Sequence, residues 1–153
     1  MKDEREKHGM NDARRPHEAL EVYRLAHALA LRAHVLSLKL PKYELHEEGG
    51  QLRRASKSVA AQVVEGHALR QYKAEYLHYL ARAYASAEET IEHLRFLQET
   101  GSARPLTAEC ETLGREYAIL GRKLFNYMRA VAKRHDPMWA DEAHERRGMN
   151  DDG

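Results

Sequence analysis

Apolar residues recur at helical spacing through most of the chain, in four blocks that glycine or proline separates. Positions three and four residues apart share one face of an α-helix, so each block predicts a helix with a face turned to a core. The expected helices cover about 17–39, 44–65, 72–99 and 105–134. Because no segment has the alternation typical of strands, the sequence predicts an all-α protein.

The apolar faces of the first two predicted helices differ in the size of their side chains. The first has one seam of Val22, Ala26, Leu29, Ala33, Leu36 and Leu40, and a second of Leu20, His27, Leu31, His34 and Leu38. The second has the smaller-sided face Leu45, Gly49, Leu52, Ser56, Val59 and Val63. We expect the Gly49–Gly50 pair to weaken the start of that helix and Gly66 to cap its end.

The apolar surface of the fourth helix is wider than packing against one core requires. Its main stripe is Leu106, Cys110, Leu113, Tyr117, Leu120, Leu124, Tyr127 and Val131, and a second lies beside it. Two stripes predict packing against another copy of the chain, although a deeply central helix in a monomer would also explain them. The residues expected at the oligomer interface are Gly114, Ala118, Gly121, Phe125 and Met128 of this block, and Tyr72, Tyr76 and Tyr79 of the third.

Short loops between long helices favour antiparallel neighbours, and hence an up-down-up-down four-helix bundle. We expect the bundle domain to span 17–135, between a flexible N-terminal arm, 1–16, and a flexible C-terminal tail, 136–153. Trp139 in that tail either anchors on a neighbour or belongs to a loose segment.

Composition places the chain in a broad class. No apolar run approaches the ~18 residues of a membrane span, and the first ten residues lack the apolar segment of a secretory signal, so we expect a cytoplasmic protein with no membrane partner. Cys110 is the only cysteine, which excludes an intrachain disulfide and favours a buried core residue.

Charge suggests a polyanionic partner. The net charge is +1, but residues 14–134 hold 20 Lys or Arg against 14 Asp or Glu, a net +6. The candidate nucleic-acid-binding residues are Arg53, Arg54, Lys57, Arg70 and Lys73 around the second helix, and Arg115, Arg122, Lys123 and Arg129 on the fourth, followed by Lys133 and Arg134. Solvated or salt-bridged helix flanks are the alternative, with Arg53 or Arg54 pairing Glu65, Glu88 or Glu89.

Two functions remain open. One is a nucleic-acid-binding accessory protein, for which single-stranded or structured RNA is easier to accommodate than base-specific duplex DNA, because no recognition-helix motif is present. The other is a protein-interaction scaffold that presents the tyrosine stripe to a protein partner without a nucleic-acid ligand.

Sequence motifs give little support to catalysis. Glu75 and His78 have the Glu-x-x-His spacing of di-iron bundles, but a second such pair is missing. The chain has no Gly-rich phosphate loop and no pattern that partners a serine or cysteine nucleophile. We therefore expect no enzyme, no metal site and no cofactor.

Several short segments resemble a known family. They are Leu40-Pro41-Lys42, Gln51-Leu52-Arg53-Arg54-Ala55, Ser58-Val59, Glu65-Gly66, Lys73, Glu75-Tyr76, Leu80 and Ala85-Ser86 with Glu88 or Glu89. Over about 17–133 the chain resembles the bacterial four-helix bundle proteins first noticed as products of intervening sequences in 23S ribosomal RNA genes. The resemblance implies a small cytoplasmic protein that assembles into a homopentameric ring and has no established enzymatic activity.

The same family is similar to the accessory proteins of diversity-generating retroelements, which are basic pentameric rings that bind nucleic acid and a reverse transcriptase. This chain departs from the family pattern after Val59, where Ala60 and Gln62 replace the usual proline and asparagine. It departs again at Glu47-Glu48, which replace a glycine-leucine pair.

Overall fold

The computed structural model describes residues 15–134, and four long helices account for most of them. They are α1 (Glu21–Leu38), α2 (Glu48–Ala68), α3 (Lys73–Glu99) and α4 (Thr107–Arg134), preceded by the short 3-10 turn η1 (Pro16–Ala19). The described part of the chain contains no strand, so the all-α prediction is confirmed there.

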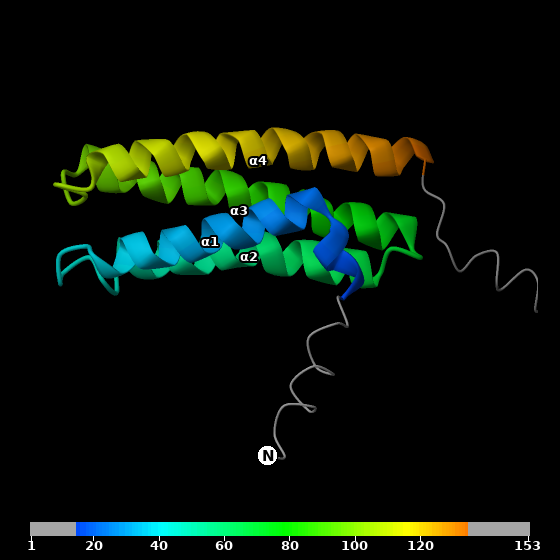
Figure 1. Ribbon diagram of the computed structural model, residues 1–153, viewed down its shortest axis with the longest axis horizontal. Coiled ribbons are helices and arrows are strands. Elements are labelled where there is room, and N and C mark those ends of the chain that lie inside the picture. Colours follow the sequence, from blue (N-terminus) through cyan, green and yellow to red (C-terminus); the bar gives the residue numbers. More distant parts are fainter. Residues whose placement is uncertain (1–14, 135–153) are drawn as a thin grey trace, which may run out of the picture.

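The helices lie side by side as one bundle (Figure 1). The α1–α2 and α3–α4 connections lie at one end of the bundle, and the α2–α3 turn lies at the other (Figure 1). Long interfaces join α1 to α2, α2 to α3 and α3 to α4, whereas α1 and α4 meet along a shorter stretch. The bundle is therefore less tightly closed between its first and last helices.

The core follows the predicted seams closely on three helices. All six residues of the first α1 seam are buried, as are Cys110, Leu113, Tyr117, Leu120, Leu124 and Val131 of α4. On α2 every residue of the predicted face except Leu45 is buried. On α3 the buried residues are Tyr76, Leu80, Ala83, Ala87, Thr90, Leu94 and Leu97.

The second α1 seam lies largely outside the core of the subunit. Leu31 and Leu38 point to solvent, with 59% and 57% of their surface exposed, and Val35 between them is 55% exposed. Residues 31, 35 and 38 lie on one helix face, so they form a continuous apolar stripe of α1. Because α1 contacts α4 over only a short stretch, the bundle leaves this side of α1 uncovered.

The beginning of α2 shows why two glycines stand there. We expected fraying, but Gly49 and Gly50 are buried in the first turn, and the Gly49 N–H donates to the Glu44 carbonyl at 2.8 Å. A Cβ atom on Gly49 would lie 2.8 Å from that carbonyl oxygen. The missing side chain thus lets the α1–α2 connection close tightly onto the helix.

We predicted that Gly66 caps α2, but the helix continues to Ala68. A Cβ atom there would lie 2.9 Å from the Cβ of Tyr79 and 3.3 Å from the Tyr76 ring. Gly66 therefore serves a close approach between α2 and α3. The first helix also begins later than expected, since Leu20 is extended and separates η1 from α1.

The predictions for the flexible arm and tail, including Trp139, fall almost wholly on 1–14 and 135–153, which lie outside the described residues. Within 15–134, no helix is both long enough and apolar enough to cross a lipid bilayer.

Candidate nucleic-acid interface

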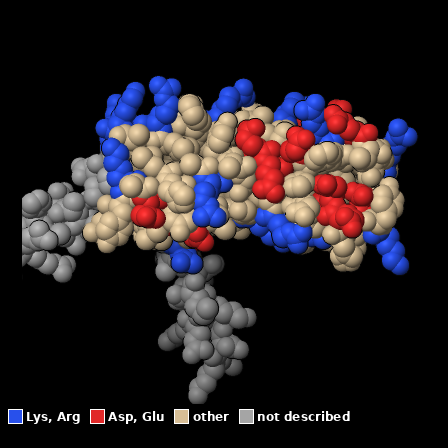
Figure 2. Space-filling model, turned by 180° about the vertical axis from the view of Figure 1, so that it is seen from behind, with Lys and Arg blue, Asp and Glu red and all other residues tan. Residues whose placement is uncertain are grey.

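The charges of α4 are divided between its two halves. Residues 107–120 hold three Glu and one Arg, whereas 121–134 hold five Lys or Arg and no acid. The acidic excess of α3 lies in its second half, where 87–99 contain four Glu and one Arg. From behind, the acidic side chains gather mainly in the half that holds the α1–α2 and α3–α4 loops, and basic side chains line the edge formed by α4 (Figure 2).

The α2–α3 turn and the C-terminal end of α4 lie at the same end of the bundle (Figure 1). A small cluster fixes them together: Tyr76 and Leu80 of α3 pack with Val131 of α4. We call the half of the bundle that contains this turn and residues 121–134 of α4 the basic end, and define it as Arg70, Lys73, Arg122, Lys123, Arg129, Lys133 and Arg134.

Aromatic contacts hold the basic end together. The hydroxyl groups of Tyr76 and Tyr127 are hydrogen-bonded, with their rings edge to face. The His67 ring packs edge to face on Tyr76 with centroids 6.1 Å apart. Burial, with contributions from Arg70 and His17, lowers the pKa of His67 to about 4. Burial also raises the pKa of Tyr76, so its phenol stays protonated.

The cations of the basic end are not equivalent. Arg122, Arg129 and Lys73 are exposed and form no hydrogen bond or ion pair within residues 15–134. Lys123 differs, because its ammonium lies 2.5 Å from the Glu21 carboxylate, and this contact lowers the pKa of Glu21. Arg70 donates to the His67 carbonyl at 2.9 Å, which ties its side chain to the end of α2.

The other predicted basic residues are placed elsewhere. Arg53 is half-buried and donates to Ser37 Oγ at 2.9 Å and to the Leu45 carbonyl at 2.6 Å. It therefore joins α2 to α1 and to the connection between them, and it does not pair with the glutamates considered above. Arg54 and Lys57 are exposed on the same half of α2, and Arg115 lies in the more acidic half of α4.

The predicted tyrosine stripe does not form one surface. Tyr72 is exposed, Tyr79 is half-buried and Tyr76 is buried in the subunit's own core. On α4, Met128 packs against the Tyr76 cluster and Gly121 is buried near Glu88 and Tyr84 of α3. Tyr76 and Met128 thus already have partners inside the subunit.

Gly114, Ala118 and Phe125 remain available on α4. Gly114 has open space beside its Cα, and Ala118 and Phe125 are exposed. Phe125 lies one turn from Arg122 and one turn from Arg129, so a surface that covered its ring would also have to accommodate both guanidinium groups. The predicted interface and the predicted nucleic-acid site therefore compete for this part of α4.

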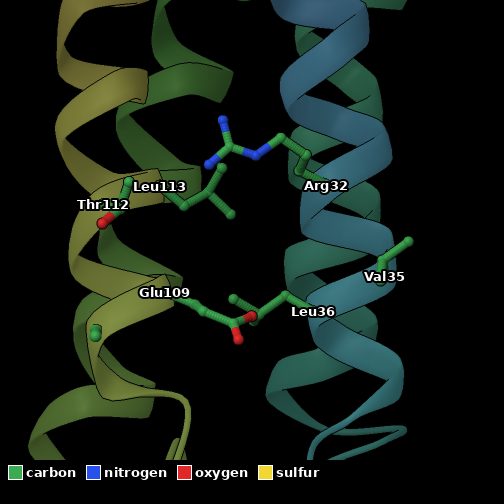
Figure 3. A pocket seen from close by; sticks show the side chains of 7 residues that line it. Arg32, Val35, Leu36, Glu109, Thr112 and Leu113 are labelled. Atoms are coloured by element: carbon green, nitrogen blue, oxygen red, sulfur yellow. The ribbon is translucent and has the colours of Figure 1, made fainter.

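A shallow cleft opens where α1 and α4 meet least closely. It measures about 340 Å³ and is lined by Arg32, Val35, Leu36, Ala108, Glu109, Thr112 and Leu113. Arg32 and Leu36 extend from α1 towards α4, and Glu109 and Leu113 from α4 towards α1 (Figure 3). Arg32 forms an ion pair with Glu116, and the Lys39 ammonium lies 3.7 Å from Glu109. The charged groups of this cleft are satisfied across it.

Cys110 lies apart from both the cleft and the basic end, between α3 and α4. Burial raises the pKa of the Cys110 thiol to about 11, so it is not an activated nucleophile. Within residues 15–134, no group of three or more His, Cys, Asp or Glu side chains is placed to hold a metal ion. What the basic end offers chemically is fixed positive charge beside aromatic rings.

Residues 18–126 match the model of one protein family, described as 23S rRNA-intervening sequence protein. The matched range covers α1, α2, α3 and most of α4, and it ends before Arg129. A search of curated proteins found no match to this chain.

Proposed function

We propose that this chain, which belongs to the 23S rRNA-intervening sequence protein family, is a non-enzymatic accessory protein that binds RNA through the basic end of its bundle. The family description refers to ribosomal RNA, which makes RNA the first nucleic acid to test. The resemblance to retroelement accessory proteins points to the same class of ligand.

One observation carries the proposal: the second half of α4 concentrates five cations without an acid, and Arg122 and Arg129 are exposed with no partner in residues 15–134. Cations near a helix C-terminus also stabilise the helix, but by only about 0.3–1 kcal/mol each. Side chains in this arrangement can neutralise backbone phosphates, and the release of counterions then drives binding.

The proposal includes assembly of several copies. The apolar stripe of α1 is the surface best suited to a second copy, because the neighbouring charges Arg32 and Lys39 are already paired with α4. Phe125 is a poorer candidate, since it is flanked by Arg122 and Arg129, which have no partner within residues 15–134. The family resemblance implies five copies, and loops at alternating ends support an up-down-up-down course of each subunit. Pooled basic ends would strengthen binding by multivalency.

The test is RNA binding as a function of salt. We expect the full chain to bind a labelled RNA at low ionic strength, with log affinity falling linearly with log salt concentration. Each phosphate contact that is removed should reduce the magnitude of that slope by about one, so Arg122→Glu with Arg129→Glu should reduce it by about two or more.

A matched charge reversal serves as the control. Lys42 and Arg104 are exposed cations in the loops at the opposite end of the bundle, and Lys42→Glu with Arg104→Glu changes the net charge equally. The control variant should keep most of the RNA affinity. Equal losses of RNA affinity in the two variants would show that only the net charge matters. Absence of binding by the natural chain at low salt would reject the proposal.

The apolar stripe of α1 also supports a second candidate function, a protein-interaction scaffold without a nucleic-acid ligand. In that case a protein partner covers Leu31, Val35 and Leu38, and reversal of Arg122 and Arg129 leaves its capture unchanged. Recovery of the protein from its own cells with a protein but no RNA would favour this alternative.

A further inference from the structure

We propose that Tyr72 provides a stacking platform for an unpaired base, which makes the basic end selective for single-stranded over double-stranded RNA. This inference rests on the proposed function and adds the class of RNA to it. The residue immediately precedes α3, and 58% of its surface is exposed. Within the described residues its side chain forms no hydrogen bond, ion pair or ring contact.

The backbone holds this exposed ring in a defined place. The Tyr72 N–H donates to the Leu69 carbonyl at 2.8 Å, and its carbonyl accepts from the Tyr76 N–H at 2.9 Å. One turn further along α3, Tyr76 packs against the Val131 cluster and so fixes the start of α3 to the end of α4. The ring therefore projects from an ordered turn.

Cations lie close to Tyr72 in the chain and at the same end of the bundle. Arg70 and Lys73 lie on either side of it in the chain, and the last turn of α4, with Lys133 and Arg134, ends at the same end of the bundle. An exposed aromatic ring among cations suits single strands, because a base can stack on the ring while its phosphates meet the charges. In a duplex the bases are already stacked, and the ring gains nothing.

Tyr43 makes a matched comparison possible. It is the other exposed tyrosine of a connecting segment, 66% exposed, but it lies in the α1–α2 connection at the opposite end. Its neighbours Lys42 and Glu44 cancel in charge, whereas Tyr72 has Arg70 and Lys73 nearby, and the Tyr43 hydroxyl donates to Ser102 Oγ at 3.5 Å. If ring exposure alone promoted binding, the two tyrosines would contribute equally.

The experiment compares three probes on the full chain by fluorescence anisotropy: a single-stranded RNA of about 20 nucleotides, its blunt duplex, and an abasic strand with the same number of phosphates. Tyr72→Ala should weaken binding of the single strand about fivefold or more. Binding of the duplex and of the abasic strand should not change, and neither should the salt dependence. Tyr72→Phe, which keeps the ring, should retain the natural affinity, and Tyr43→Ala should have no effect.

Other results would overturn the inference. Equal weakening with all three probes, no weakening with any, or an altered sedimentation coefficient of Tyr72→Ala would show that the ring does not act by stacking. These outcomes leave RNA binding itself intact. Failure of the natural chain to bind any of the probes at low salt would instead reject the proposed function.

Discussion

The two ends of the bundle are built from different chemistry. At the basic end, aromatic rings and a close approach at Gly66 hold α2, α3 and α4 together, and Lys73, Arg122 and Arg129 have no partner within residues 15–134. At the opposite end several polar groups are bonded within the subunit. Arg53 bonds Ser37 and Leu45, while His93 of α3 lies 2.7 Å from Glu48 and 3.3 Å from Glu89.

This contrast separates folding from binding. Charged groups that form hydrogen bonds or ion pairs within the subunit stabilise the fold, whereas charged groups without such partners are available to a ligand. The apolar stripe of α1 lies towards the second end, so assembly and RNA contact are assigned to different parts of the molecule.

The largest effect is expected at the apolar stripe of α1. Val35→Glu with Leu38→Glu would place charges in the proposed interface between copies, where an unpaired buried charge costs about 3–5 kcal/mol. The assembly should dissociate while circular dichroism shows an intact helical fold, because both side chains are exposed in the subunit. Sedimentation velocity measures this, with Phe96→Ser as the control at an exposed apolar residue of α3. A natural chain that sediments as a monomer at micromolar concentration would contradict the assembly.

Arg53→Ala should destabilise the fold without removing RNA binding. The half-buried guanidinium makes two hydrogen bonds between α2 and the α1 side of the bundle, and loss of charge-assisted bonds costs about 1.5–3 kcal/mol. Urea unfolding should show a lower midpoint at an unchanged slope. Arg54→Ala, on an exposed neighbour, should stay within about 0.5 kcal/mol of the natural chain. Reduced RNA affinity in folded Arg53→Ala would break the proposed separation.

Two glycines should respond in opposite directions to the same substitution. Gly66→Ala forces α2 and α3 apart because the new methyl group would meet the Tyr79 Cβ at 2.9 Å, and overpacking of this kind costs about 1–3 kcal/mol. Gly114→Ala has open space and should stabilise the fold by about 0.5–1 kcal/mol through helix propensity. Thermal or urea unfolding compares the two. A stabilised Gly66→Ala variant would show that the close approach is not required.

The last effect appears only at acidic pH and concerns His67. The pKa of His67 is about 4 in the folded chain against 6.5 as its ordinary value, so between these limits the unfolded chain binds a proton that the folded chain does not. This contribution to stability is complete above about pH 6.5 and declines as the pH falls towards 4. His67→Gln should flatten that part of the profile, because glutamine binds no proton in this range. An unchanged pH profile in His67→Gln would contradict the role of His67.

The sequence predicted the fold because the inward residues repeat with helical period. All six residues of the first α1 seam and the main α4 stripe from Cys110 to Leu124 are buried as that period requires. It failed where periodicity does not say which of two adjacent apolar faces is covered. Leu31 and Leu38 belong to a regular seam, but the shorter α1–α4 contact leaves them outside.

The candidate site was predicted only in part, because charge counts do not reveal partners. The sequence contained the cations of α4, but it gave no sign that Lys123 pairs with Glu21, 102 residues away. It also grouped Arg53 with Arg54, although one faces Ser37 and the other faces solvent. The predictions for Gly49 and Gly66 failed for a related reason. Gly66 and Gly49 could be identified as special from their type, but whether they cap a helix or admit a neighbour depends on contacts between segments.

Because Cys110 is buried, the rate at which its thiol is labelled reports how often the subunit opens. The thiol is 1% exposed between α3 and α4, and it is the only one in the chain. A thiol-specific reagent can modify it only when the helices separate, so the labelling rate in native buffer reports how often that happens. Ligands that hold the subunit closed would slow the reaction, and no added fluorophore or engineered cysteine is needed to detect them.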